Sequence, residues 1–154
     1  RATEVSRRVR VIVVVVCAAV IADWTTKVVA STTLDDRPLA VGSTLALRLS
    51  HNTGVAFGLG HRLPVPLVLA LTGALTVVLA LVLLRGVRSS PLAVGLVFGG
   101  AVANLGDRVV GGSVVDFLDL RWWPSFNLAD MALTVGCGLM LLQSLRASTP
   151  PTTA

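Results

Sequence analysis

Four long apolar stretches occupy most of this 154-residue chain and decide what it can fold into. They extend over residues 9–29, 64–84, 91–106 and 128–145. A helix needs about 20 apolar residues to cross the hydrocarbon core of a bilayer, with a range of about 17 to 25. Only 14% of the residues are charged, against roughly 25% in soluble domains. We therefore predict an all-α membrane protein with four transmembrane helices.

The predicted spans form a single membrane domain over residues 1–146, and the connections between them complete the fold. Residues 30–63 favour a small extracytoplasmic β element, because "RPLAV" and "STLALRLS" flank Gly42-Ser43, which predicts a two-residue hairpin turn. In the connection "DRVVGGSVVDFLDLRWWPSFN", Gly111-Gly112 is expected to interrupt helical structure. The residues after it predict an interfacial amphipathic helix. Residues 147–154 are polar and proline-rich, which predicts a disordered C-terminal tail.

The distribution of charge predicts how the chain is oriented. Basic residues cluster before the first span, between the second and third spans, and after the fourth. Four spans place these regions on one side, which the positive-inside rule assigns to the cytoplasm together with both termini. The aspartates and tryptophans fall at or beyond the opposite ends of the spans, so the polar chemistry faces outward. The formal net charge of +5 therefore marks topology, and we expect no nucleic-acid partner.

Asp116 and Asp130 are the chemically unusual residues, because apolar side chains frame each of them in "VVDFLDLRWWPSFNLAD". Placing an ionisable residue at membrane depth costs roughly 2.5–3.5 kcal/mol. Two carboxylates that converge in a poorly hydrated pocket do not both ionise easily, so one of them keeps a proton. Such a pair supplies a general acid and a general base for attack of water on an amide. The alternative is that both aspartates only cap helices or meet lipid headgroups.

Asp107 competes with Asp116 for a place in that pair. It adjoins Arg108 in a glycine-containing polar stretch, and a nearby cation favours the charged form of a carboxyl group. Asp107 therefore suits an ion pair better than a proton transfer. We expect Asp116 to belong to the pair and Asp107 to organise the site.

Asp23 and Lys27 lie four residues apart in the first span, on one face of the predicted helix, where they can form an ion pair. A structural pair and a role in shaping a site are both open from the residues alone. Ser31 follows Lys27 by four residues, which raises a Ser–Lys hydrolase as a competitor. Ser31 opens a run "STT" that is typical of a helix end, so we disfavour this alternative.

Five stretches of the chain resemble, in order, motifs of the lipoprotein signal peptidases (signal peptidase II), the bacterial intramembrane aspartyl proteases. They are "DWTTK", "NTGVAFG", "GGAVANLGDR", "VVDF" and "FNLAD", and they cover all four predicted spans. The resemblance implies an aspartic endopeptidase of the bacterial cytoplasmic membrane. It implies cleavage of the signal peptide from a prolipoprotein, just before a diacylglyceryl-modified cysteine, with Asp116 and Asp130 as catalytic residues. The connection between these two aspartates is several residues shorter than is usual in the family.

The same motifs imply a group of residues that bind substrate or shape the site. Asn52 and Gly54 lie in an outer loop that is expected to reach over the pocket, although a turn with positive φ would also explain Gly54. Asn104 and Asn127 each precede an aspartate by three residues, where they orient it or join helices. Ala129 is expected to leave room for the lipid-modified cysteine. The full set is Asp23, Lys27, Asn52, Gly54, Ala56, Asn104, Asp107, Arg108, Asn127 and Ala129.

We expect no metal and no cofactor, because His51 and His61 have no ligand partners at metal spacing. The expected partners are the prolipoprotein and membrane lipid, and nothing in the sequence demands more than a monomer. Two other classes of membrane protein compete with the protease interpretation. A small transporter would place acids near the midplane of several spans and show a repeat, whereas here they cluster at one rim. An inert scaffold would not require two carboxylates in apolar settings.

Overall fold

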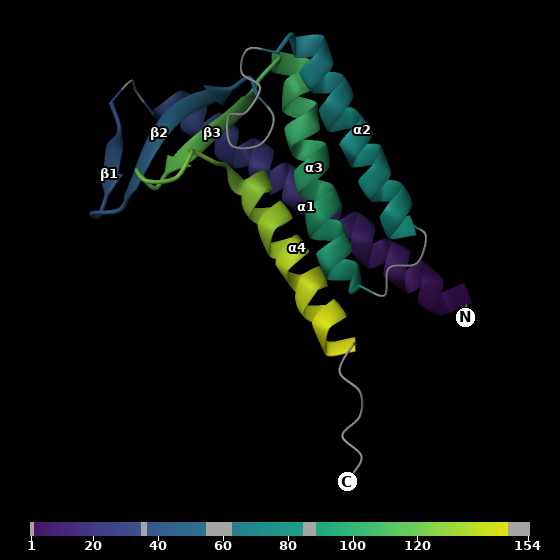
Figure 1. Cartoon of the computed structure of the whole chain (residues 1–154). Helices are drawn as coiled ribbons and strands as arrows, with labels where there is room; N and C mark the ends of the chain where they lie inside the picture. Colours follow the sequence, from purple (N-terminus) through teal and green to yellow (C-terminus); the bar gives the residue numbers. More distant parts are fainter. Residues whose placement is uncertain (1, 35–36, 55–62, 85–88, 148–154) are drawn as a thin grey trace.

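The computed structural model describes residues 2–34, 37–54, 63–84 and 89–147. In these ranges the chain forms four helices and three strands, in a helical bundle with a small sheet at one end (Figure 1). They are α1 (Ala2–Thr33), β1 (Leu39–Val41), β2 (Leu45–Asn52), α2 (Val65–Leu84), α3 (Pro91–Gly111), β3 (Val114–Asp119) and α4 (Leu128–Ala147). The prediction of a mostly helical protein with a small β element is therefore confirmed. The predicted tail after Ala147 lies outside the described residues.

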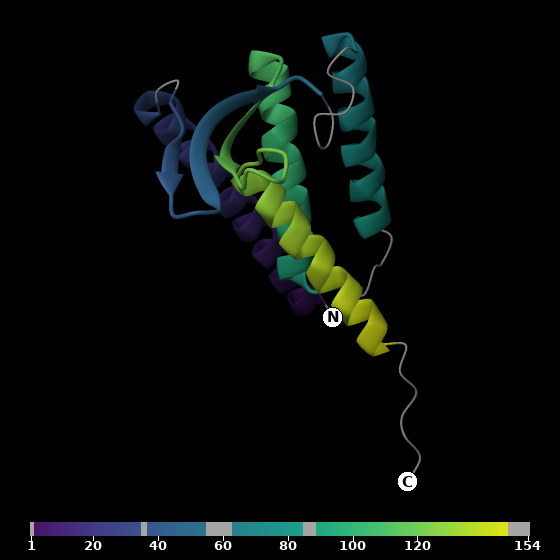
Figure 2. The same cartoon turned by 60° about the vertical axis from the view of Figure 1, so that its left-hand side comes forward.

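Three of the helices, α1, α3 and α4, are long and apolar enough to cross a membrane, and α2 is a further apolar helix of 20 residues. The helix α3 lies between α1 and α4, and α2 packs against it from another side (Figure 2). The first turn of α1 and the last turn of α4 lie at the end of the bundle away from the sheet (Figure 1). At this end Ser90 caps α3, and its backbone N–H donates to Oε1 of Gln143 at 2.8 Å.

Glycines let α3 approach its two neighbours closely. A methyl group added at Gly95 would lie 2.6 Å from the Cβ atom of Val15 on α1, and one added at Gly99 would lie 2.8 Å from that of Ala19. On the other side, a methyl group at Gly100 would collide with the carbonyl oxygen of Ala129 at the start of α4. Such small residues are how membrane helices gain packing energy where lipid competes for apolar surface.

We expect Gly100→Ala to lower the stability of the protein by about 1–3 kcal/mol, because overpacking forces α3 and α4 apart. Gly138 on α4 is the matched control, since a methyl group there meets nothing within 4 Å. Gly138→Ala should leave stability unchanged or raise it, as alanine favours the helix. Thermal unfolding midpoints in detergent measure both changes, and equal midpoints for the two variants would contradict this packing.

The sheet has the order β1-β2-β3, with both pairs antiparallel. Val41 pairs with Leu45, so the hairpin turn holds three residues rather than the two expected from the sequence. Gly42 begins the turn with φ 75°, a left-handed conformation that glycine adopts without strain. The predicted hairpin is thus confirmed in place, although its turn is one residue longer.

The predicted interfacial helix is wrong, because β3 occupies that part of the chain and pairs with β2. The segment "VVDFLD" has strand-forming residues at alternate positions, and its pairing covers the edge that β2 would otherwise expose. The helix α3 also continues to Gly111, five residues past the predicted end, because a helix extends through polar residues once it leaves the apolar layer. Asp107 and Arg108 therefore lie within α3.

Candidate active site

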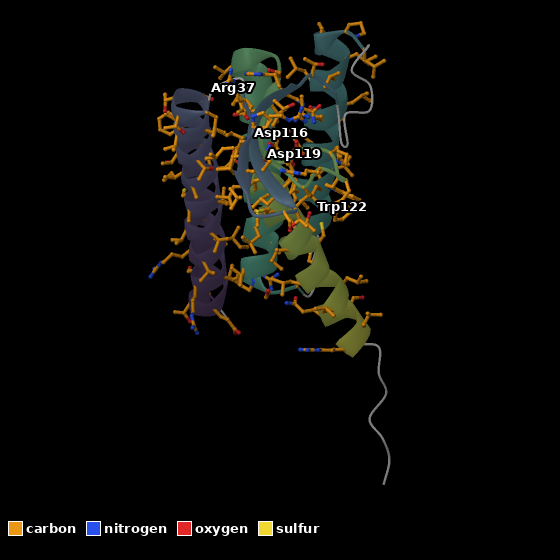
Figure 3. The ribbon with its side chains drawn as sticks, turned by 90° about the vertical axis from the view of Figure 1, so that its left-hand side faces the viewer. Arg37, Asp116, Asp119 and Trp122 are labelled. Carbon is orange, nitrogen blue, oxygen red and sulfur yellow. The ribbon has the colours of Figure 1, made fainter. Side chains whose placement is uncertain are left out.

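Asp116 is held on β3 with its side chain in the interior, where 2% of the residue is exposed. Its Cα partner in the sheet is Ser50 of β2. Nδ2 of Asn127 donates to Oδ1 of Asp116 at 2.7 Å, and Asn52 forms a further side-chain hydrogen bond with this carboxyl group. Figure 3 shows Asp116 in the region between the sheet and the helices. A carboxyl group is thus brought to the junction of sheet and bundle.

Asp130 reaches the same place from the first turn of α4. Asn127 caps this helix: its Oδ1 accepts from the N–H of Asp130 at 2.9 Å, and its own N–H donates to Oδ2 of Asp130 at 3.4 Å. This reciprocal pair is a capping box, written in the sequence as "NLAD". Nδ2 of Asn104 on α3 donates to Oδ1 of Asp130 at 2.7 Å. Two helices therefore fix the orientation of this carboxyl group.

Asn127 connects the two aspartates, because its amide serves Asp116 while its backbone and Oδ1 serve Asp130. The residue is fully buried. Asp116 and Asp130 both line one cavity of about 650 Å³, together with Asn52, Asn104 and Arg108. The structure thus brings together the two aspartates that the sequence singled out. Asn104 orients Asp130 on another helix, rather than Asp107 on its own.

The pKa of Asp116 is raised from its ordinary value of 3.8 to about 6. Burial is the largest cause, and the negative charge of Asp130 is the second. Hydrogen bonds from Asn127 and Asn52 and the charge of Lys27 act in the opposite direction. The ionised form of Asp116 is therefore disfavoured both by burial and by a second carboxyl group that lines the same cavity.

We expect Asp116→Asn to stabilise the protein at neutral pH. The folded protein holds the Asp116 proton more tightly than the unfolded chain, so the free energy of unfolding falls as pH rises from about 4 to about 6 and stays low above it. A shift of this size corresponds to at most about 3 kcal/mol, which the neutral amide avoids. Unfolding midpoints should be higher for the variant at pH 7.5 and equal to wild type at pH 4. A pH-independent difference would contradict this assignment.

Lys27 forms the centre of an ion cluster behind the aspartate pair. Its Nζ lies 2.5 Å from Oδ2 of Asp23 and 2.7 Å from Oδ2 of Asp107, and it donates to Oδ1 of Asn104 at 3.3 Å. The Asp23–Lys27 pair is thus confirmed. Asp107 forms its ion pair with Lys27 and not with the adjacent Arg108, because neighbouring residues on a helix point in different directions. Lys27 is fully engaged and Ser31 is exposed, so a Ser–Lys arrangement finds no support.

Arg108 connects α3 to the outer loop that contains Gly54 through side-chain hydrogen bonds. Its Nη2 donates to the carbonyl oxygen of Gly54 at 2.9 Å, and its Nη1 donates to that of Asn104 at 3.0 Å. Gly54 is buried, and its N–H donates to Oδ1 of Asn52 at 3.0 Å. This places Asn52 beside Asp116. Ala56 and His61 lie outside the described residues.

Ala129 is not among the residues that line the cavity, and its role in leaving room for the lipid-modified cysteine stays a prediction. It is 1% exposed, and its N–H donates to Oδ1 of Asp23 at 2.8 Å. Its carbonyl oxygen faces Gly100. The small side chain is explained by the close contact of α4 with α1 and α3, which in turn positions Asp130.

Sequence reasoning missed the apolar wall of the cavity. It is formed by Leu120, Trp122, Trp123, Phe126, Met131, Leu133 and Val135. The rings of Trp122 and Trp123 meet edge to face with centroids 5.7 Å apart, and Trp122 is 73% exposed (Figure 3). The adjacent tryptophans Trp122 and Trp123, in the segment between Asp116 and Asp130, were the sequence signal that could have located this wall. In the part of the chain that is described, no group of three or more His, Cys, Asp or Glu side chains is placed to hold a metal ion.

The chain is similar to known proteins over most of its length. Residues 15–146 match the family described as signal peptidase (SPase) II. A lipoprotein signal peptidase of Syntrophomonas wolfei is 45% identical over 112 residues, which cover 70% of this chain and 72% of that protein. One of Rhodococcus jostii is 35% identical over 153 residues, or 92% and 76% of the two chains. A solved bacterial membrane enzyme, 26% identical, superposes with a TM-score of 0.77 and covers 93% of each chain.

Proposed function

The chain belongs to the signal peptidase II family, and from this premise we propose that Asp116 and Asp130 are the catalytic pair of a membrane aspartic protease. Membership makes it a membrane-embedded, multi-pass protease that removes signal peptides from prolipoproteins. The observation that carries the assignment is that both carboxyl groups line one cavity and share Asn127 as a hydrogen-bond partner.

The proposed chemistry needs one proton on the pair. The ionised carboxylate takes a proton from a water molecule, which attacks the carbonyl carbon of the scissile amide. The protonated carboxyl group passes its proton to the leaving amine as the C–N bond breaks. The raised pKa of Asp116 supports this division of roles. Asn104 and Asn127 orient the carboxyl oxygen atoms that transfer protons. This orientation lowers the entropy that is lost when the reacting groups align.

The walls of the cavity support a lipid-modified substrate. Most of the lining beyond the polar end is hydrocarbon or aromatic, so it suits acyl chains better than a hydrophilic peptide. We propose that a diacylglyceryl cysteine lies there, with the bond on its amino side at the aspartates. The exposed Trp122 supports a position at the membrane interface, where tryptophan is enriched.

The proposed topology has four spans, with α2 as the fourth. Both termini then lie in the cytoplasm, and the sheet and cavity lie at the outer face. The positions of the basic residues support this orientation, as does the placement of the first turn of α1 and the last turn of α4 away from the sheet (Figure 1). The site is built from one chain, so we propose that the enzyme acts as a monomer.

The direct test is cleavage of a defined substrate. Purified protein in detergent is incubated with a diacylglyceryl prolipoprotein, with and without a metal chelator and a serine-directed reagent. We expect the substrate to shorten equally under all conditions. The unmodified precursor, which lacks the diacylglyceryl group, is the matched control and should remain uncut. Inhibition by the chelator or by the serine reagent would reject the aspartic mechanism.

A further inference from the structure

A second cavity, of about 530 Å³, shares no lining residue with the catalytic cavity. The strand β3 separates the two: Val114 and Asp116 line the catalytic cavity, while Val115 between them lines the second. Successive residues of a strand point to opposite faces, which explains the alternation. The remaining walls come from α1, α3, the β2 residue His51, and Ser113 between α3 and β3. Nothing in the proposed cleavage reaction uses this cavity.

The polar end of the second cavity is formed by two carboxyl groups. Asp23 and Asp107 line it, and both contact Lys27. The side chain of Asp107 is 19% exposed, against 2% for Asp23, so Asp107 is the acid that the cavity presents outward. Arg108, the next cation along α3, lines the catalytic cavity instead, although its charge also interacts with that of Asp107. The second cavity therefore offers a cationic group one partly exposed carboxylate.

The rest of this cavity is apolar and open towards the surroundings of the bundle. Val20, Val102 and Val110 form its walls, with Val110 almost fully exposed. Trp24 adds an indole ring that is 65% exposed. An aromatic face attracts a cation, and attracts it more strongly where water is scarce. The combination suits a molecule with a positively charged head and a hydrocarbon body.

We propose that the second cavity binds a phospholipid with an ammonium headgroup, of the phosphatidylethanolamine type. Its ammonium group lies between Asp107 and the ring of Trp24, and its acyl chains follow the valine walls. The proposal requires a membrane protein but does not depend on the identity of the catalytic residues, because its test measures lipid binding and not cleavage.

Native mass spectrometry of the delipidated full chain tests the proposal with two probes, dioleoyl phosphatidylethanolamine and dioleoyl phosphatidylglycerol. We expect at least five-fold more of the first lipid to be bound at equal concentrations. A methyl group added at Gly106, which lines this cavity, meets nothing within 4 Å. Gly106→Leu therefore extends an apolar side chain into the cavity from a position where its Cβ meets no neighbour, and it should lower phosphatidylethanolamine binding at least five-fold. The matched control Gly138→Leu, at an equally open helix position outside both cavities, should bind as wild type does.

Asp107→Asn separates charge from shape. It removes the partly exposed carboxylate of the cavity and leaves Lys27 with Asp23, so the preference for the ammonium lipid should fall to less than two-fold. Equal binding of the two lipids by the wild type would overturn the proposal. Equal binding of phosphatidylethanolamine by Gly106→Leu and Gly138→Leu would also overturn it. This comparison remains decisive even if Asp107→Asn fails to fold.

Discussion

Replacing Asp116 or Asp130 by asparagine should each reduce cleavage of a diacylglyceryl prolipoprotein by about 1,000-fold or more. General acid–base catalysis contributes roughly 10²- to 10⁴-fold per positioned group, and groups that act as a unit lose nearly all of it together. Asparagine preserves the shape of either side chain. In place of Asp116 it can accept the hydrogen bond from Nδ2 of Asn127, and in place of Asp130 that from Nδ2 of Asn104, but it cannot take up or release the proton. The measurement is the initial rate of signal-peptide release by purified protein at matched concentration.

Asp119→Asn is the matched control for this prediction. Asp119 lies on the same strand, three residues from Asp116, and pairs with Arg48 at 3.0 Å outside the cavity lining. Arg48 is half exposed, and ion pairs near the surface contribute about 0–1 kcal/mol, so cleavage should stay within two-fold of wild type. Retention of a tenth or more of the wild-type rate by either catalytic variant would remove that residue from the pair.

Lys27→Met should destabilise the protein by about 3–5 kcal/mol, the usual cost of leaving a buried charge without its partner. The lysine holds Asp23 and Asp107 together at the junction of α1 and α3. It also donates to Asn104, whose amide orients Asp130. We therefore expect a large fall in the thermal unfolding midpoint and a loss of cleavage. Circular dichroism in detergent measures the midpoint, and the release assay measures the rate.

A second substitution distinguishes charge from packing in this cluster. Adding Asp23→Asn to Lys27→Met removes one of the stranded carboxylates, so the double variant should recover part of the lost stability. The effects of contacting residues are not additive, and the recovery measures their coupling. A double variant that is less stable than Lys27→Met alone would show that the ion cluster does not explain the loss.

The helices were predictable because their signal is long and physical. Long apolar runs located all four helices, and the i,i+4 spacing located the Asp23–Lys27 pair. The ends were less predictable: α1 begins at Ala2 and α3 reaches Gly111, beyond the apolar residues that define a span. Helices continue into the interface wherever polar side chains find partners, which hydropathy does not register.

The segment around Asp116 was the part that sequence reasoning misjudged. Its short run of apolar and acidic residues, "VVDFLD", fits a strand as well as an amphipathic helix, and periodicity alone does not separate them. The exposed edge of β2 decides the matter, and only the tertiary structure reveals that edge. The same limit applies to Asp107, whose partner Lys27 lies 80 residues away in sequence, and to the second cavity, which Asp107 lines.

One proton shared by Asp116 and Asp130 is the basis of the proposed cleavage mechanism. The carbon-13 shift of the Asp116 carboxyl group reports that proton as pH changes. We predict a titration midpoint near pH 6 in the wild type. In Asp130→Asn the midpoint should fall, because the neighbouring negative charge that raises it is gone. An Asp116 that titrates near pH 4, or whose midpoint ignores Asp130→Asn, would contradict the shared proton.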